Sequence, residues 1–365
     1  AAAFLMAFFV GVPYVEIMLA AIIPAVLFYV SVLLGVQFIS VGLRIKAPKE
    51  APDYPLIRRR LPVFLIPLTI IIVLLLMHFS PMMAAFWAIV TAVVLSLISA
   101  DTRPTWGEFC RGMASGALTG AWIGVSLCVV GIIAQTLITT GLGSKIASLV
   151  EAIAGGNLVV ALLMTMVVSL ILGCGVPPVA AYSLVAIVTV PVLVNMGVEV
   201  LSAHFFCFYF SIISAVTPPV ALGALAGAGI AHASYFKTSM HAFKLAIAGF
   251  IIPFLIVFNP ILTLNVADWL LGLGAMVAIP VGLIWLGAAI YNVGLVRMSP
   301  LERLITAGAA CCLLGFSLFR DIDHAPLLIT LFGGGLALSV TVLVMQIKKK
   351  RLPQEELVSV VPEQA

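Results

Sequence analysis

The chain has 365 residues, of which 63% are hydrophobic and only 9% are charged. A water-facing surface needs far more charged residues, so the composition excludes an ordinary soluble globular protein. A helix that crosses a bilayer about 30 Å thick needs roughly 20 apolar residues, and such stretches recur here between short polar breaks. We therefore predict an all-α polytopic membrane protein.

Eight apolar runs are predicted to span the membrane. They are Tyr14–Ser40, Leu61–His78, Met82–Ala100, Met113–Thr136, Phe243–Leu264, Trp269–Ile290, Leu301–Phe319 and Pro326–Gln346. The sequence opens at Ala1 inside a further apolar stretch, without an initiator Met, so we expect a missing upstream segment.

The basic residues give these spans a direction. When alternate loops are assigned to one side, the 18 Lys and Arg residues fall together except for Lys145 and Arg320. Positive charge collects on the cytoplasmic side of membrane proteins. The loop Arg44–Arg60 and the tail after Gln346 are therefore predicted to be cytoplasmic.

A charge-free stretch, Ala152–Val198, is interrupted at Gly173–Pro178, where a helix cannot continue. Its limbs, Leu158–Leu172 and Val179–Val194, are each about 22–24 Å long at 1.5 Å per residue, shorter than the hydrocarbon core. A cytoplasmic loop would be expected to carry Lys or Arg. We predict a re-entrant hairpin over residues 158–194, with two tilted full spans as the alternative.

The next charge-free stretch, residues 201–230, is broken once, at Ser214–Pro219. A Pro-Pro pair removes two backbone donors and frees carbonyl groups, which in lipid need a partner from protein, water or an ion. Transporters use such broken helices for ion and substrate sites, and we predict one here. The alternative is that both breaks are packing kinks.

The ligands at these breaks are neutral oxygens, namely backbone carbonyls and the hydroxyls of Ser214 and Thr217. This chemistry favours a hard monovalent cation. Half-helices that begin near Val179 and Val220 would present unpaired N–H groups to an anion. Residues predicted to contact that anion are Val176, Pro177, Pro178, Val179, Pro218 and Pro219.

Other polar residues receive structural roles. No Asp or Glu is predicted at mid-membrane depth, which favours sodium over proton coupling. His204 is interpreted as an interfacial or packed histidine, and the six cysteines as small packing residues. A ladder of glycines at Gly112, Gly116, Gly120 and Gly124 predicts close helix contact.

The sequence has no Walker A, HExxH or GxSxG motif, so neither an enzyme nor a cofactor is expected.

Several segments together resemble one family. They are Thr140–Gly143, Ala154–Leu158, Leu172–Pro177, His204–Pro219 and Gly227–Ala231. The chain resembles the fused permease of tripartite ATP-independent periplasmic (TRAP) transporters, most of all the branch served by TAXI-type binding proteins. The opening residues Ala1–Ala7 and the segment Leu301–Leu304 also fit, so the resemblance covers nearly the whole chain.

The resemblance implies sodium-driven uptake of small organic anions across a bacterial or archaeal inner membrane. It implies an elevator-like movement, a periplasmic TAXI-type substrate-binding protein as partner, and no nucleic acid. The missing N-terminal half would hold the small-subunit helices and a first hairpin. The family's sodium site maps onto Gly173 and Gly175 at the hairpin tip and onto Ser214 and Thr217 at the break.

The chain departs from the family pattern at the hairpin tip. Pro178 and Val179 stand where two threonines are usual, and Ala215 stands where an Asn is common. The hydroxyls lost at the tip leave the substrate undetermined.

An inverted repeat gives the predicted organisation, because the matching segments Ala21–Pro24 and Phe250–Pro253 lie in spans of opposite direction. Chance in an Ile-rich protein is the alternative. Residues 1–45 would end the first repeat, 46–60 form a cytoplasmic linker, and 61–265 form the second repeat. Residues 266–346 would be a C-terminal transmembrane extension and 347–365 a cytoplasmic tail.

Two other functions fit the same residues. One is a sodium-coupled carrier or exchanger that works without a binding protein. The other is a channel or scaffolding subunit whose breaks are structural.

Overall fold

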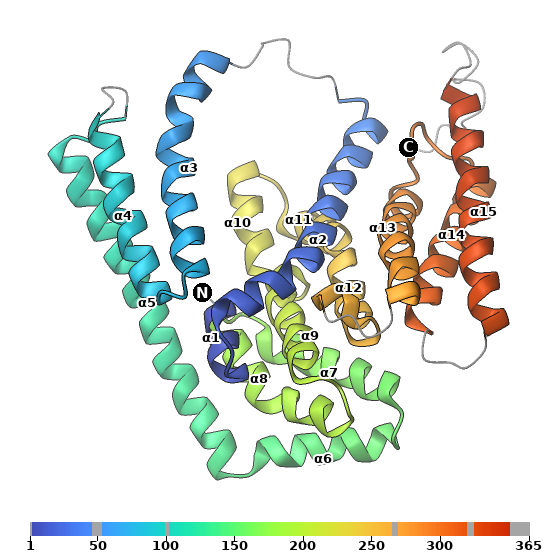
Figure 1. Cartoon of the computed structure of the whole chain (residues 1–365), viewed down its shortest axis with the longest axis horizontal. Helices are drawn as coiled ribbons and strands as arrows, with labels where there is room; N and C mark the ends of the chain where they lie inside the picture. Colours follow the sequence, from blue (N-terminus) through green and yellow to red (C-terminus); the bar gives the residue numbers. More distant parts are fainter. Residues whose placement is uncertain (1, 46–52, 99–101, 265–268, 320–324, 351–365) are drawn as a thin grey trace. The chain divides into compact units, whose positions relative to one another are not determined.

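The computed structural model describes residues 2–45, 53–98, 102–264, 269–319 and 325–350 (Figure 1). Within these ranges every regular element is helical, and the one β feature is an isolated bridge between Val293 and Arg297. This confirms the all-α polytopic class. Residues 351–365 of the predicted tail and residues 46–52 of the predicted linker lie outside the described residues.

The helices fall into two compact units, each of them discontinuous in sequence. The first unit comprises Ala1–Leu19 and Ala47–Met196, and the second comprises Ala20–Lys46 and Gly197–Ala365. The helices from the N-terminus to the end of the first unit are α1 (Ala2–Val10), α2 (Tyr14–Gly42), α3 (Tyr54–Leu76), α4 (Pro81–Ile98), α5 (Trp106–Thr139), α6 (Leu142–Ala154), α7 (Leu158–Gly173) and α8 (Pro178–Asn195). The remaining elements are α9 (Val200–Ile213), the 3₁₀ turn η1 (Ser214–Val216), α10 (Leu222–Ala231), α11 (Tyr235–Leu245), α12 (Ile247–Phe258), η2 (Pro260–Thr263), α13 (Trp269–Tyr291), α14 (Pro300–Leu318) and α15 (Ala325–Lys350).

Nine helical segments of the described chain are long and apolar enough to cross a membrane. Eight of them correspond to the predicted spans, and the ninth is α8, the second limb of the predicted hairpin. Helix α7 is too short for the same criterion of length, with 16 residues. The helical hairpin is therefore confirmed, while its re-entrant position in the membrane stays a prediction.

The core of the first unit forms around α8, on which α7, α6, α5 and α1 pack. Ala180, Ala181 and Tyr182 in its first turns are fully buried. The ring of Phe9 in α1 lies near Tyr182, with ring centroids 6.0 Å apart. The hairpin is therefore the most enclosed part of this unit.

Helix α6 was not among the predicted elements, and it carries Lys145 and Glu151. Its buried residues Ala147, Val150 and Ala154 follow helical spacing and form a cluster with Ala161 and Val192. A charged outer face and an apolar inner face thus make an amphipathic helix that packs on the hairpin.

The second unit is built on aromatic contacts between α9 and α12. Phe206 and Phe254 have ring centroids 5.1 Å apart, and Phe210 and Phe250 are 5.9 Å apart. Gly249 lets these helices approach closely, since a Cβ there would lie 2.5 Å from Ile213. This packing holds the helix that precedes the break.

The helices α13, α14 and α15 of the predicted extension pack on one another in sequence order. A buried amide links this group to α12, because Asn259 Nδ2 donates to Leu255 O at 3.0 Å and to Ser317 O at 2.8 Å. A capping box of Ser299 and Glu302 begins α14.

Two packing predictions need correction. A Cβ built at any of the four ladder glycines from Gly112 to Gly124 meets no atom within 4 Å, so no described helix of the first unit packs there. Of the six cysteines, all free, only Cys207 is buried, and Cys110, Cys128 and Cys311 are exposed.

Candidate ion and substrate site

The hairpin tip is a tight turn between α7 and α8. The Cys174 N–H donates to Ile171 O at 3.2 Å, and the Val176 N–H donates to Gly173 O at 3.4 Å. Gly175 has a φ of 74°, in the left-handed region that favours glycine. Gly173 is buried and Gly175 is exposed, so the two predicted ligands differ in their access to solvent.

Helix α8 begins without a side-chain cap from its N-cap residue, Pro177. Pro177 and Pro178 have no N–H, and the Ala181 N–H already donates to Pro177 O at 2.8 Å. The N–H groups of Val179 and Ala180 lie in the first turn, which offers them no intrahelical acceptor. Ala180 is fully buried, so the Val179 N–H, together with the helix dipole, is the group suited to an anion.

The predicted substrate residues of the tip divide by their surroundings. Pro177 and Pro178 are exposed and Val179 is half-buried, at the start of α8. Val176 instead packs against a cluster that contains Val130 and Leu184. The structure thus places Val176 as a packing residue, while the other three lie at the helix N-terminus.

The break after α9 is a single 3₁₀ turn, Ser214–Val216. The Ser214 hydroxyl donates to Ser211 O at 2.6 Å, and the Thr217 hydroxyl donates to Ile213 O at 2.8 Å. A hydroxyl has one proton and two lone pairs. Because both protons are already used, these oxygens can only accept from, or coordinate, a further ligand, which favours a cation over an anion.

A tyrosine supports the backbone just beyond the break. The Tyr235 hydroxyl in α11 donates to Pro219 O at 2.9 Å and to Val220 O at 2.8 Å. This contact ties α11 to the turn that follows the Pro-Pro pair. Sequence reasoning missed Tyr235, because no local pattern links it to Pro219 or Val220.

The second half-helix begins later than predicted. Helix α10 starts at Leu222, after Ala221 in the left-handed region with a φ of 31°, rather than near Val220. A Cβ on Gly223 would lie 3.2 Å from Val216 and 3.3 Å from Ala215 O, so the returning chain passes close to the break. Pro218 is half-buried and Pro219 exposed in the intervening turn.

Two further hydroxyls, Thr165 and Ser169, lie on α7 and were not predicted. Both are buried, and neither hydroxyl oxygen has a hydrogen-bond partner in the part of the chain that the structure describes. With Gly173 they form an i, i+4, i+8 row that leads to the tip. That spacing is visible in the sequence and is the signal that would have found them.

His204 lies within the core of the second unit, with 6% of its surface exposed. It is therefore a packed histidine rather than an interfacial one. Among the described residues, no three His, Cys, Asp or Glu side chains gather as a metal-binding group.

The four predicted sodium ligands divide between the two units. Gly173 and Gly175 belong to the first, and Ser214 and Thr217 to the second, where they share one turn.

A helical membrane protein with a helical hairpin and a second helix broken at Pro-Pro pairs belongs to the class of membrane transport proteins. Residues 1–268 match the family model of the DctM component of the tripartite ATP-independent periplasmic transporter. The chain belongs to this family and is a TRAP transporter membrane permease, of the large-subunit type. None of the curated proteins or solved structures matches the chain.

Proposed function

We propose that this permease couples the inward movement of sodium to the uptake of a small organic anion delivered by a periplasmic binding protein. Membership of a tripartite periplasmic transporter family supports the need for such a partner. The resemblance to the TAXI-associated branch supports a TAXI-type partner, and the distribution of basic residues supports an inner-membrane protein with a cytoplasmic C-terminus.

The sodium assignment rests on one observation, which is that both hydroxyl groups at the break donate their protons to backbone carbonyls. Ser214 and Thr217 both donate to backbone carbonyls, which leaves oxygen lone pairs as the groups they offer. Neutral oxygens suit an alkali cation, which is transported together with the substrate. At the hairpin tip, the carbonyl oxygens of Gly173 and Gly175 are neutral ligands of the same kind.

The proposed binding site for the anion is the N-terminus of α8. The N–H of Val179 in the first turn of α8 has no intrahelical acceptor, and Pro177 and Pro178 beside it are exposed. A carboxylate bound there would receive hydrogen bonds from backbone alone. An elevator movement would then carry the ion and the anion together.

The test is sodium activation of uptake by a Thr217→Ala variant in proteoliposomes. We expect the sodium concentration for half-maximal uptake to rise about tenfold or more, because loss of a ligand to a charged group costs about 1.5–3 kcal/mol. Thr238→Ala is the matched control, since the Thr238 hydroxyl also donates to a carbonyl four residues earlier, Ser234 O, at 3.0 Å. Equal sodium activation in the two variants would refute the site assignment.

A further inference from the structure

The first residue of α11, Tyr235, reaches back to the chain that leaves the break. Its hydroxyl oxygen lies 2.9 Å from Pro219 O and 2.8 Å from Val220 O, and its one proton is shared between these two acceptors. The contact joins residues that are 16 and 15 positions apart in the sequence. Because all of α10 lies between them, the hydroxyl closes a loop that contains a whole helix.

The turn beyond the break is poor in backbone donors. The Ala221 N–H donates to Thr217 O at 3.2 Å, and this bond encloses Pro218, Pro219 and Val220. Two of these three enclosed residues are prolines, which have no N–H. A side chain that holds the carbonyl oxygens of the turn therefore adds a constraint that its own backbone cannot supply, and Tyr235 is such a side chain.

Thr217 is the residue whose position depends on this turn. Its backbone is extended, with a φ of −99° and a ψ of 129°, so it is not part of a helix. On one side its N–H donates to Ser214 O at 3.3 Å and its hydroxyl donates to Ile213 O at 2.8 Å. On the other side its carbonyl accepts from Ala221, in the same turn that Tyr235 contacts. One turn of backbone thus links the Tyr235 hydroxyl to the Thr217 hydroxyl.

The start of α10 also lies against the break. Helix α10 packs on both α11 and η1, and Ala221 and Ala224 at its start are buried. A Cβ on Gly223 would lie 3.2 Å from Val216, so little space separates the turn from η1. Because packed groups transmit a displacement to their neighbours, a shift of the turn would reach the residues of η1.

We infer that Tyr235 is a positioning residue for the cation site at the break. The inference rests on the proposed function, because it takes Ser214 and Thr217 as ligands of the cation. The Tyr235 hydroxyl contacts the turn and not these ligands, and it holds the turn so that Thr217 is in place before the ion arrives. A site that is organised in advance loses less conformational entropy on binding, so it binds more tightly.

Tyr235→Phe tests this inference, because it keeps the ring and removes only the hydroxyl. The measurement is sodium activation of uptake by the full-length permease in proteoliposomes with its binding protein. The sodium concentration for half-maximal uptake should rise about threefold or more, as expected for the loss of one hydrogen bond. The maximal rate at saturating sodium should stay close to that of the unmodified protein. A merely structural role would instead lower the unfolding midpoint and the maximal rate at an unchanged half-maximal sodium concentration.

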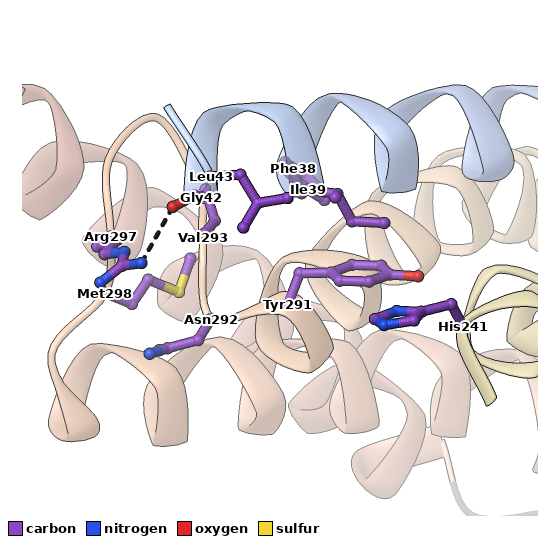
Figure 2. A pocket seen from close by; sticks show the side chains of 10 residues that line it. All are labelled: Phe38, Ile39, Gly42, Leu43, His241, Tyr291, Asn292, Val293, Arg297 and Met298. Carbon is purple, nitrogen blue, oxygen red and sulfur yellow. Dashed lines mark hydrogen bonds between the residues drawn. The ribbon is translucent and has the colours of Figure 1, made fainter. Parts of the chain in front are cut away.

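Tyr291→Phe is the matched control in the same unit. Tyr291 lines a pocket of about 400 Å³, and Figure 2 shows its hydroxyl end directed to the side on which His241 of α11 lies. The Tyr291 hydroxyl has no hydrogen-bond partner among the described residues, so its removal breaks no contact with the turn. This variant should leave the sodium concentration for half-maximal uptake unchanged.

A double variant shows whether Tyr235 acts through Thr217. If it does, Tyr235→Phe should raise the half-maximal sodium concentration by a smaller factor in the Thr217→Ala background than in the unmodified protein. Equal factors in the two backgrounds, or equal effects of Tyr235→Phe and Tyr291→Phe, would overturn the inference. A shift in Thr217→Ala without one in Tyr235→Phe would overturn this inference alone, whereas no shift in Thr217→Ala would refute the proposed site and this inference with it.

Discussion

Four hydroxyl groups near the two breaks differ in what their protons do. Those of Ser214 and Thr217 donate to backbone carbonyls, whereas those of Thr165 and Ser169 are buried without a partner in the described part of the chain. The first pair offers lone pairs to a cation. The second pair lacks a partner that a transported ligand or a bound water would supply.

Replacing Thr165 with valine tests whether its unpaired hydroxyl serves a transported ligand. Thr165→Val keeps the shape and removes a hydroxyl that the protein leaves unsatisfied, so the free energy of unfolding should rise by about 1 kcal/mol. If the hydroxyl serves a transported ligand, sodium-dependent uptake should fall in the same variant. The measurements are unfolding in detergent and uptake in proteoliposomes.

Thr306→Val is the control for stability, because the buried Thr306 hydroxyl donates to Glu302 O at 2.7 Å. It should lower the free energy of unfolding by about 1 kcal/mol. A loss of stability in Thr165→Val as large as in Thr306→Val would mean that Thr165 is satisfied within the protein.

The prolines and glycines in the sequence were sufficient to predict the two breaks as elements. The hairpin limbs were placed within about one residue of α7 and α8, because Pro-Pro cannot continue a helix. The start of α10 was placed too early, since Ala221 adopts a left-handed conformation that its sequence does not favour. Tertiary contacts to Val216 and Tyr235, which local pattern does not encode, determine that turn.

The hairpin tip depends on its positive-φ glycine. Gly175→Ala should cost about 1–2 kcal/mol, because an L-residue with a Cβ is strained at a φ of 74°. Gly143→Ala is the control within the same unit, on α6, where a Cβ meets no atom within 4 Å. It should be neutral or stabilising by about 0.5–1 kcal/mol.

Unfolding midpoints and sodium-dependent uptake measured on both variants decide this prediction. A Gly175→Ala protein as stable and as active as Gly143→Ala would show that the tip does not require the left-handed conformation.

At the scale of the whole molecule, composition and the apolar pattern predicted the class and the spans but not the grouping of the helices. The membrane class follows from composition, and the eight predicted spans all correspond to helices. The compact units cut across the predicted domains, since residues 20–46 group with the C-terminal half and residues 1–19 with the hairpin. Sequence order did not predict this grouping, because it arises from contacts between distant helices.

Topology is tested by a cysteine at Arg59 in a variant without the six native cysteines. Arg59 is exposed on α3 and belongs to the predicted cytoplasmic loop, so a membrane-impermeant thiol reagent should label it only from the cytoplasmic side. A cysteine at the exposed Lys145 should label only from the opposite side. Labelling of both positions from one side would overturn the orientation.

The most direct measurement is uptake of radiolabelled dicarboxylates and glutamate by the full-length permease in proteoliposomes, with and without its periplasmic binding protein. Our account predicts uptake that requires both an inward sodium gradient and the binding protein. Uptake that is independent of the binding protein, or flux without sodium coupling, would contradict it.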